Sequence, residues 1–307
     1  MQRLRIGLIG WGTMGAAFGE LVQDGPLPIS LAAIAVRDPA RARAIPMPDG
    51  VDVVRPDEAL DVDVVVELAG GVEGPLTWAR ATLERGTPYV TANKALLATH
   101  GGELAGLATA NVAALLASAS VGGGTPMIEM TTHLAATGRI ERLRGAVNAT
   151  TTYILSAMGE GRSYDEALAA AQAAGYAEAD PSLDVDGRDA AQKLAILASV
   201  AWGRWRPEAD VSTTGIVGLE VQPGETVRLV ADATPDRLRV APIPVDPEDP
   251  LARVTGVENL LEITMRDGSI FRVSGPGAGG PACVTAVYAD VARLVAGERP
   301  ILFRSAS

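Results

Sequence analysis

A glycine-rich turn between an apparent strand and an apparent helix constrains the fold more than any other feature of the chain. The apolar run Ile6–Ile9 fits a buried strand, and Gly10-Trp11-Gly12-Thr13-Met14-Gly15 follows it directly. Apolar residues at helical spacing come next, at Phe18, Leu21 and Val22. Glycines in this pattern permit a tight turn and let a pyrophosphate reach backbone N–H groups at the positive end of the helix. The sequence therefore predicts a dinucleotide-binding turn; the alternative is a glycine-rich turn without a ligand.

Further apolar runs alternate with helical stretches through the first half of the chain. These runs are Leu31–Val36, Val64–Leu68, Tyr89–Val90 and Val112–Leu116, and LTWARATLERG is one of the helical stretches. Alternation of this kind builds a doubly wound parallel sheet with helices on both faces. We therefore expect an α/β chain with a Rossmann-type domain over residues 1–125.

The second half has a different pattern. Five segments resemble strands of a more open sheet: RIERLRGAV, TVRLVADAT, RLRVAPIPV, LLEITMR and IFRVS. Helices are expected at about 164–174, 187–203 and 281–296. We predict an α+β substrate domain over residues 126–280. Residues 281–307 should form a C-terminal helix that packs back on the Rossmann domain.

Charge and cysteine content exclude several classes of partner. The net charge of −11 argues against nucleic acid and against an anionic membrane, because both need a basic face. Leu104–Ile128 carries no charge, but Asn111, three glycines at 122–124 and Pro126 interrupt it, so a membrane helix is not expected. The single cysteine, Cys283, rules out a disulfide framework within one chain and suits a reducing cytoplasm.

Arg37 follows the second predicted strand, where an NAD enzyme usually carries an acid that binds the ribose 2′-hydroxyl. A cation at this position favours a 2′-phosphate, and Arg41 and Arg43 add positive charge nearby. Asp38 favours NAD if its side chain turns inward, and an exposed loop arginine without a ligand is the other alternative. We expect NADP to bind more tightly than NAD, with both accepted as substrates.

Five carboxylates crowd the segment 177–193, AEADPSLDVDGRDAAQK. They are Glu178, Asp180, Asp184, Asp186 and Asp189. A calcium loop aligned on Gly187 would place Lys193 at the twelfth position, where a bidentate glutamate belongs. An ammonium there opposes the ion, so a calcium loop is rejected and no metal ligands are predicted.

The last of these acids belongs to a predicted helix over 187–203, with Asp186 as its N-cap. At about 100° per residue, Asp189 and Lys193 are neighbours on a mostly apolar row of this helix. The polar strip is expected elsewhere, on Arg188, Gln192 and Ser199. A partly buried ion pair of this kind is costly and more often functional than an exposed one.

A lysine that an aspartate holds beside a pocket can polarise a carbonyl oxygen and deliver a proton to it. The nearby Glu178 and Asp184 would then receive a substrate ammonium. A purely structural ion pair is the alternative interpretation.

The segment GYAEADPSLDVDGRDAAQKLAIL closely resembles the signature segment of homoserine dehydrogenases in order and spacing. Supporting stretches run along most of the chain: GLIGWGTMG, VVELAGG, VTANKALLA, ASVGGGTPMI, NATTTYIL, TGIVGL and GPGAGGPACVTAVYAD. The resemblance implies reversible NAD(P)H-dependent reduction of aspartate 4-semialdehyde to homoserine, a step of threonine and methionine biosynthesis. It also implies a Rossmann domain and a catalytic domain that forms a homodimer.

The resemblance assigns roles to individual residues. Lys193 matches the catalytic lysine, Asp189 its partner, and Lys94 a second lysine that faces the substrate. The implied substrate-binding residues are Glu178, Asp184, Tyr176 and Thr150. The implied cofactor-binding residues, beyond the glycine turn and Arg37, are Ala69, Gly70, Gly277, Ala278 and Gly279.

Three stretches depart from the family pattern. The loop Asn148-Ala149-Thr150-Thr151-Thr152-Tyr153 lacks a glycine and an asparagine, which bears on the fit of the substrate. Ser118 stands where the family has an acid near a monovalent-cation site, which puts a bound cation in doubt. GIVGLEVQPGETVRLV is shorter than its counterpart, and the short tail GERPILFRSAS leads us to expect a form without a regulatory domain.

Two other functions stay open. The replacements at Ala149 and Thr152 fit an oxidoreductase of a related amino-acid aldehyde or hydroxy acid. A non-catalytic NADP-binding protein is the other possibility, although a sensor has no evident need of both Lys193 and Lys94.

Overall fold

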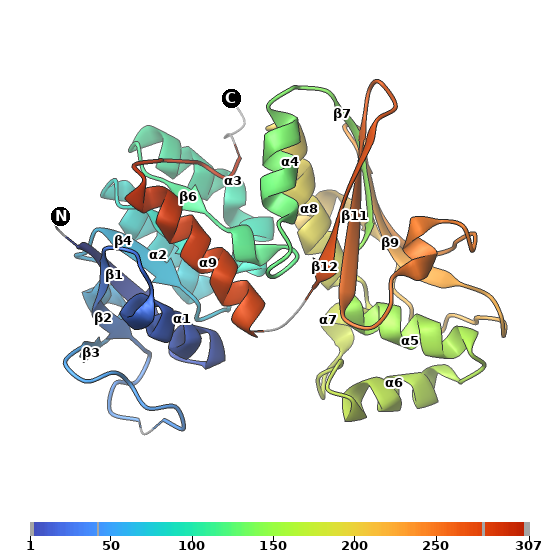
Figure 1. The fold of residues 1–307 in the computed structure, drawn as a ribbon, viewed down its shortest axis with the longest axis horizontal. Helices are drawn as coiled ribbons and strands as arrows, with labels where there is room; N and C mark the ends of the chain where they lie inside the picture. Colours follow the sequence, from blue (N-terminus) through green and yellow to red (C-terminus); the bar gives the residue numbers. More distant parts are fainter. Residues whose placement is uncertain (1–2, 42, 278–279, 304–307) are drawn as a thin grey trace. The chain divides into compact units, whose positions relative to one another are not determined.

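The apolar runs of the first half pair as a six-stranded parallel sheet (Figure 1). The computed structural model describes residues 3–41, 43–277 and 280–303, without the side chains of residues 280 and 281. The strands lie in the order β3-β2-β1-β4-β5-β6. Their bounds are β1 (Leu4–Ile9), β2 (Ile29–Ala35), β3 (Asp52–Val54), β4 (Val64–Glu67), β5 (Tyr89–Thr91) and β6 (Leu115–Leu116). This order is that of a Rossmann fold, which confirms the predicted fold class.

Helices cover both faces of this sheet. They are α1 (Thr13–Asp24), α2 (Glu73–Glu84), α3 (Lys94–Ala110) and α9 (Gly280–Val295), with 3₁₀ turns η1 (Pro56–Ala59) and η2 (Ser118–Ser120). On β5, Val90 packs in one apolar cluster with residues of α1 and α9. The adjacent Tyr89 donates its hydroxyl to the carbonyl of Pro75 on α2 (3.4 Å). Neighbouring strand residues point to opposite faces, so α1 and α9 cover one face and α2 the other.

The last helix, α9, belongs to the same compact unit as the N-terminal sheet (Figure 1). Its Asp290 is 1% exposed. This carboxylate accepts hydrogen bonds from the backbone N–H (2.9 Å) and the hydroxyl (2.6 Å) of Ser118, the first residue of η2, which follows β6. A buried acid that accepts two bonds from one residue fixes the position of the helix against the strand end.

A mixed six-stranded sheet forms the second unit, which spans Thr125–Trp202 and Arg206–Ala278. The strand order is β12-β11-β7-β9-β10-β8, in which only β8 and β10 pair in parallel. The strands are β7 (Ile140–Ala146), β8 (Val211–Thr213), β9 (Val227–Thr234), β10 (Arg237–Pro244), β11 (Glu258–Met265) and β12 (Ile270–Pro276). The helices are α4 (Met127–Ala135), α5 (Ala149–Gly159), α6 (Tyr164–Ala173), α7 (Ser182–Val185) and α8 (Arg188–Trp202), with 3₁₀ turns η3 (Glu208–Asp210) and η4 (Pro250–Arg253).

Helix α8 is buried along almost its whole length, from Asp189 to Ala201. The predicted polar strip on this helix is therefore wrong, since Gln192 and Ser199 are buried. Gln192 donates to the carboxylate of Glu208 (2.9 Å), and the Ser199 hydroxyl accepts from the backbone N–H of Arg206 (2.8 Å). These partners follow the helix in sequence and fold back over it, which helical periodicity cannot reveal.

The predicted N-cap at Asp186 is also wrong. Asp186 ends the short helix α7, which was not expected, and its side chain is exposed. Gly187 follows with φ +81°, a left-handed conformation that interrupts the helical path before α8 begins at Arg188.

The predicted strand over Val112–Leu116 is shorter in the structure. Val112 is exposed with φ +54°, in the turn that follows α3, and only Leu115–Leu116 pairs as β6. The uncharged stretch Leu104–Ile128 is thus divided among several elements. Within the described ranges, no helix has the length and apolarity that a membrane crossing requires.

Candidate functional site

The ammonium of Lys193 lies inside the second unit, where two oxygens contact it. Its Nζ is 2.8 Å from Asp189 Oδ2, one helical turn earlier, and donates to the carbonyl of Val147 at 2.7 Å. The lysine is 9% exposed and Asp189 5%. Because an unpaired charge at this depth is strongly unfavourable, the two residues depend on each other. The predicted pair on α8 is therefore formed and buried.

Asn148 connects this pair to a second carboxylate. Its Nδ2 donates to Asp184 Oδ1 (2.7 Å) and to Asp189 Oδ2 (2.8 Å). Its Oδ1 accepts from the backbone N–H of Thr151 (2.8 Å), so the same side chain caps α5. The sequence reasoning gave Asn148 no role. An asparagine directly before a helix is an N-cap signal, and that signal could have identified it.

Asp184 is half-buried, and this burial raises the pKa of its carboxyl above the ordinary value of 3.8. The hydrogen bond from Asn148 opposes the shift, while the negative charge of Asp189 adds to it. A carboxylate that is short of solvation gains most from a cationic partner. The arrangement therefore combines a group that can exchange a proton, Lys193, with an acidic position that can receive a cation.

Of the other predicted substrate residues, the structure brings Thr150 and Tyr176 to this cluster. The Thr150 hydroxyl donates to the backbone carbonyl of Tyr176 (2.6 Å). The Tyr176 ring lies 4.9 Å from that of Tyr153. Glu178 is exposed, and among the described residues its carboxylate shares no hydrogen bond or ion pair with Lys193, Asp189 or Asp184.

The glycine turn of the first unit has the close packing that a phosphate-binding turn needs. Gly10 has φ +105°, and a Cβ there would lie 2.8 Å from the backbone nitrogen of Ala69. A Cβ on Gly15 would collide with the carbonyl oxygen of Gly10. Helix α1 begins at Thr13 with no side-chain cap from Gly12 and no acid in its first turn. Its first N–H groups are thus available to an anion, which fits a pyrophosphate.

Trp11 links this turn to the loop after β2. Its indole N–H donates to the carbonyl of Ile45 (3.2 Å), and its ring packs against Gly19 on α1. The neighbouring Thr13 is exposed and Met14 is half-buried. The segment that carries Arg37 is therefore attached to the glycine turn.

Arg37 is exposed, and within the described chain its guanidinium makes no hydrogen bond or ion pair. Asp38 Oδ1 accepts from the backbone N–H of Ala40 (3.1 Å), so this carboxylate is engaged in its own turn. Arg43 donates to the carbonyls of Asp38 and Arg41, both at 2.6 Å. The guanidinium of Arg37 therefore stays available to a ligand, as does that of Arg41, which the described chain engages only through its backbone.

The remaining predicted positions lie in several places. Ala69 and Gly70 are exposed in the loop after β4, and Lys94 is the half-buried first residue of α3. Gly277 donates its N–H to the carbonyl of Val257 (2.8 Å) in the second unit. Two further predicted residues, Ala278 and Gly279, lie outside the described residues.

Two family models match the chain. The homoserine dehydrogenase model covers residues 126–292, and the model of the homoserine dehydrogenase NAD-binding domain covers residues 10–117. A homoserine dehydrogenase of Synechocystis is 37% identical over 95% of this chain and 73% of its own length.

Solved structures give the same result. The homoserine dehydrogenase of Thiobacillus denitrificans matches with a TM-score of 0.92 and 30% identity, over 99% of this chain and 78% of that one. A hyperthermophilic archaeal homoserine dehydrogenase in complex with NADPH matches with a TM-score of 0.86 and 27% identity, over 96% and 98%.

Asn148→Ala should lower the free energy of unfolding at pH 7 by roughly 2–4 kcal/mol, because it removes a helix cap and the donor between two acids. Ser163→Ala is the matched control, since Ser163 caps α6 at an exposed site and should cost about 1 kcal/mol. Urea denaturation of both variants measures the difference. A loss for Asn148→Ala no larger than the control's would contradict the bridging role.

The free energy of unfolding that Asn148→Ala loses should also depend on pH. Without Asn148, the folded-state pKa of Asp184 rises further above 3.8, since the bond from Asn148 lowers it now. A carboxyl whose pKa is raised by folding does not destabilise the fold below its unfolded-state pKa; the destabilisation grows as the pH rises from that value and is complete above the raised pKa. The stability gap should therefore narrow as the pH falls toward 3.8.

Proposed function

Because this chain belongs to the homoserine dehydrogenase family, we propose that it interconverts L-homoserine and L-aspartate 4-semialdehyde with a nicotinamide cofactor. The observation that carries this proposal is the buried Lys193–Asp189 pair, joined through Asn148 to Asp184. It places a proton-exchanging group next to an acidic receptor, as an amino-acid aldehyde requires. Turnover of homoserine, compared with other short hydroxy amino acids, tests it directly.

In the proposed mechanism, Lys193 gives a proton to the carbonyl oxygen of the aldehyde during reduction and takes it back during oxidation. Asp189 and the carbonyl of Val147 fix the position of its Nζ. Asp184 accepts the substrate ammonium, with Glu178 as the second proposed acid. The nicotinamide supplies or accepts the hydride when bound. The groups that would hold it include the first N–H groups of α1.

The lysine content of the chain supports this assignment. Lys94 and Lys193 are its only two lysines, and every other cation among the 26 lysines and arginines is an arginine. A lysine exchanges its proton readily, whereas an arginine stays charged. The two lysines therefore stand at the two positions for which proton exchange or direct contact with the substrate is proposed.

Thr152, one of the two positions that raised the alternative substrate, is buried. Its hydroxyl donates to the carbonyl of Asn148 (3.0 Å), in the first turn of α5. The threonine at position 152 is thus explained by a hydrogen bond in the first turn of α5 and does not require a different substrate. This favours homoserine over a related substrate.

We further propose that NADP binds more tightly than NAD and that the protein works in the cytoplasm, which its single cysteine suits. The available guanidinium of Arg37 supports the cofactor preference, because it can form paired hydrogen bonds with a 2′-phosphate. Asp38 would favour NAD if its side chain turned inward, but one of its carboxylate oxygens accepts from the N–H of Ala40 in its own turn.

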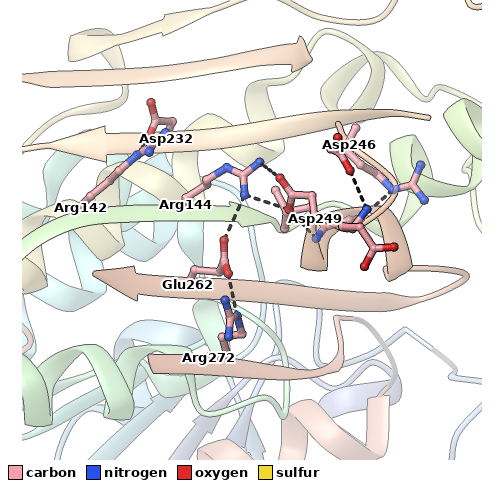
Figure 2. Close-up of polar contacts among 10 residues, drawn as sticks. Arg142, Arg144, Asp232, Asp246, Asp249, Glu262 and Arg272 are labelled. Atoms are coloured by element: carbon pink, nitrogen blue, oxygen red, sulfur yellow. Dashed lines mark hydrogen bonds and ion pairs between the residues drawn. The ribbon is translucent and has the colours of Figure 1, made fainter. Parts of the chain in front are cut away.

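We also propose a homodimer in which a second copy covers one face of the mixed sheet, here called the outer face, which carries Arg144, Glu262 and Asp232. Figure 2 shows a row of alternating charges on this face, from Arg272 through Glu262 and Arg144 toward Asp232. Glu262 accepts from Arg272 (2.7 Å) and Arg144 (3.1 Å), and Asp232 accepts from Arg142 (2.6 Å). Another surface can cover charges that are already paired, because none of them then becomes buried without a partner.

Lys193→Ala should lower kcat by roughly 10²–10⁴-fold, the usual loss when a positioned acid–base group is removed. Lys193→Arg should lose nearly as much, because the charge stays but the proton is not exchanged. Arg188→Gln is the control: Arg188 is exposed on the same helix and pairs with Glu208 (3.0 Å). Near-normal turnover of Lys193→Ala would remove this lysine from the mechanism.

Arg37→Ala should weaken NADP binding by about 1–3 kcal/mol and leave NAD nearly unchanged, because only NADP carries the 2′-phosphate. Dissociation constants for both cofactors measure this without turnover. Arg41→Ala removes a second exposed cation from the same loop and should weaken NADP less than Arg37→Ala does, because Arg41 lies farther from the end of β2. Equal losses for NADP and NAD would mean that Arg37 shapes the loop and does not contact the phosphate.

Light scattering should give a particle of about twice 31.6 kDa. Arg272→Glu should shift it toward the monomer, because it places a like charge beside Glu262 on the proposed interface. Arg293→Glu reverses a charge on α9 in the first unit, where Arg293 pairs with Glu298 (2.8 Å), and should leave the mass unchanged. A wild-type monomer, or equal masses for both variants, would refute this interface.

A further inference from the structure

Glu67, the last residue of β4, is a fully buried carboxylate with no role in the mechanism above. Its Oε1 accepts from the backbone N–H groups of Ala69 (2.7 Å) and Gly70 (2.9 Å). Its Oε2 accepts from the hydroxyl of Thr91 on β5 (2.7 Å). Burial of a carboxylate is unfavourable unless such donors surround it. An apolar residue would fill this strand end at lower cost, so the acid calls for an explanation.

The two backbone bonds fix the loop that follows β4. This loop turns through Gly70 (φ +70°) and Gly71 (φ +83°), conformations that few other residues adopt. It also lies against the glycine turn, since a Cβ on Gly10 would be 2.8 Å from the nitrogen of Ala69. β1 and β4 are neighbours at the point where the strand order reverses, and ligands bind beyond the carboxyl ends of the strands at such a point. Glu67 therefore determines the shape of one side of the cofactor crevice.

The third bond extends the network to the start of α3. The hydroxyl of Thr91 accepts from the backbone N–H of Asn93 (2.9 Å), and Asn93 Nδ2 donates to the carbonyl of Gly71 (2.6 Å). Asn93 Oδ1 accepts from the N–H of Leu96 (3.1 Å), which caps the helix whose first residue is Lys94. A closed ring of bonds thus joins the loop after β4 to the loop after β5.

The direction of these bonds requires an acid at position 67. Thr91 has a single hydroxyl proton, which it gives to Glu67 while its oxygen accepts from Asn93. A glutamine could accept the two backbone N–H groups with its oxygen, but its NH₂ group would then face the Thr91 hydroxyl. The hydroxyl proton would lose its buried acceptor, which is unfavourable. Only an ionised carboxylate satisfies all three donors at once.

We propose that Glu67 is a positioning residue for the nicotinamide cofactor. It acts through the loop at Leu68–Gly71 and, by way of Thr91 and Asn93, through the start of α3. This inference rests on the proposed cofactor use. It concerns how tightly the cofactor binds and not which substrate is turned over.

Thr91→Val is the sharpest test, because it removes the hydroxyl and preserves the shape of the side chain. Thr82→Val is its matched control: Thr82 is equally buried in the same unit, and its hydroxyl has no hydrogen-bond partner. Thr91→Val should raise the Kd for NADPH about 10-fold, and Glu67→Gln about 10- to 100-fold, as expected for an unpaired buried polar group. Thr82→Val should leave the Kd unchanged.

Binding is measured by NADPH fluorescence without substrate, and kinetics follow with homoserine. The KM for the cofactor should rise in Thr91→Val, with kcat and the KM for homoserine within about threefold of wild type. A purely structural role would lower the unfolding midpoint and leave the Kd unchanged, and that result would overturn the inference. Equal Kd values for Thr91→Val and Thr82→Val would overturn it too, even if Glu67→Gln failed to fold. Wild-type protein that binds NADPH but does not turn over homoserine would contradict the proposed function alone.

Discussion

The candidate site of the second unit depends on how one positive charge, on a side chain of a buried helix, is compensated by its neighbours. Lys193 lies on α8, where almost every residue is buried, so solvent contributes little to its charge. Asp189 on the same helix and the carbonyl of Val147 after β7 supply that compensation. Asp189 is itself buried and needs a second donor, which Asn148 provides. Removal of one partner would leave another charge unpaired, and this explains why the segments at the end of β7, at α7 and at α8 converge on one point.

The two proposed sites share one structural device, an asparagine between a strand and a helix. Asn148 follows β7 and caps α5; Asn93 follows β5 and caps α3. In each asparagine, Oδ1 accepts a hydrogen bond from a helix N–H. The amide plane is therefore fixed, and Nδ2 is directed to a particular acceptor oxygen. Nδ2 of Asn148 contacts Asp184 and Asp189, and that of Asn93 contacts the carbonyl of Gly71. A cap therefore transmits the rigidity of the strand and the helix to a loop of each proposed site.

Local pattern predicted the first unit well, because a glycine turn and alternating apolar runs identify each strand and helix, and strand–helix alternation then favours a parallel sheet. The same reasoning identified the Lys193–Asp189 pair from helical spacing alone. It failed on the surroundings of α8. Gln192 is buried because Glu208 folds back over it, and Asp186 is no N-cap because Gly187 adopts a left-handed conformation. It also gave no role to Asn148 and Glu67, whose partners lie on other elements. A single sequence does not show which polar groups pair when they lie far apart along the chain.

Arginine and lysine occupy different kinds of position in this chain: arginines form the ion-pair networks, and the two lysines lie at positions proposed to contact the substrate. On the outer sheet face, Arg144 donates to both Asp249 (2.6 Å) and Glu262 (3.1 Å), and these contacts raise its pKa further (Figure 2). Such a network needs a cation that never loses its proton and that offers several donors in fixed directions, which describes a guanidinium. A proton donor to a reacting oxygen, in contrast, must be able to lose its proton. The chain uses arginine everywhere except at positions 94 and 193. The choice between the two side chains fits whether the proton must stay or move, and this supports the proposed role of Lys193 without appeal to family likeness.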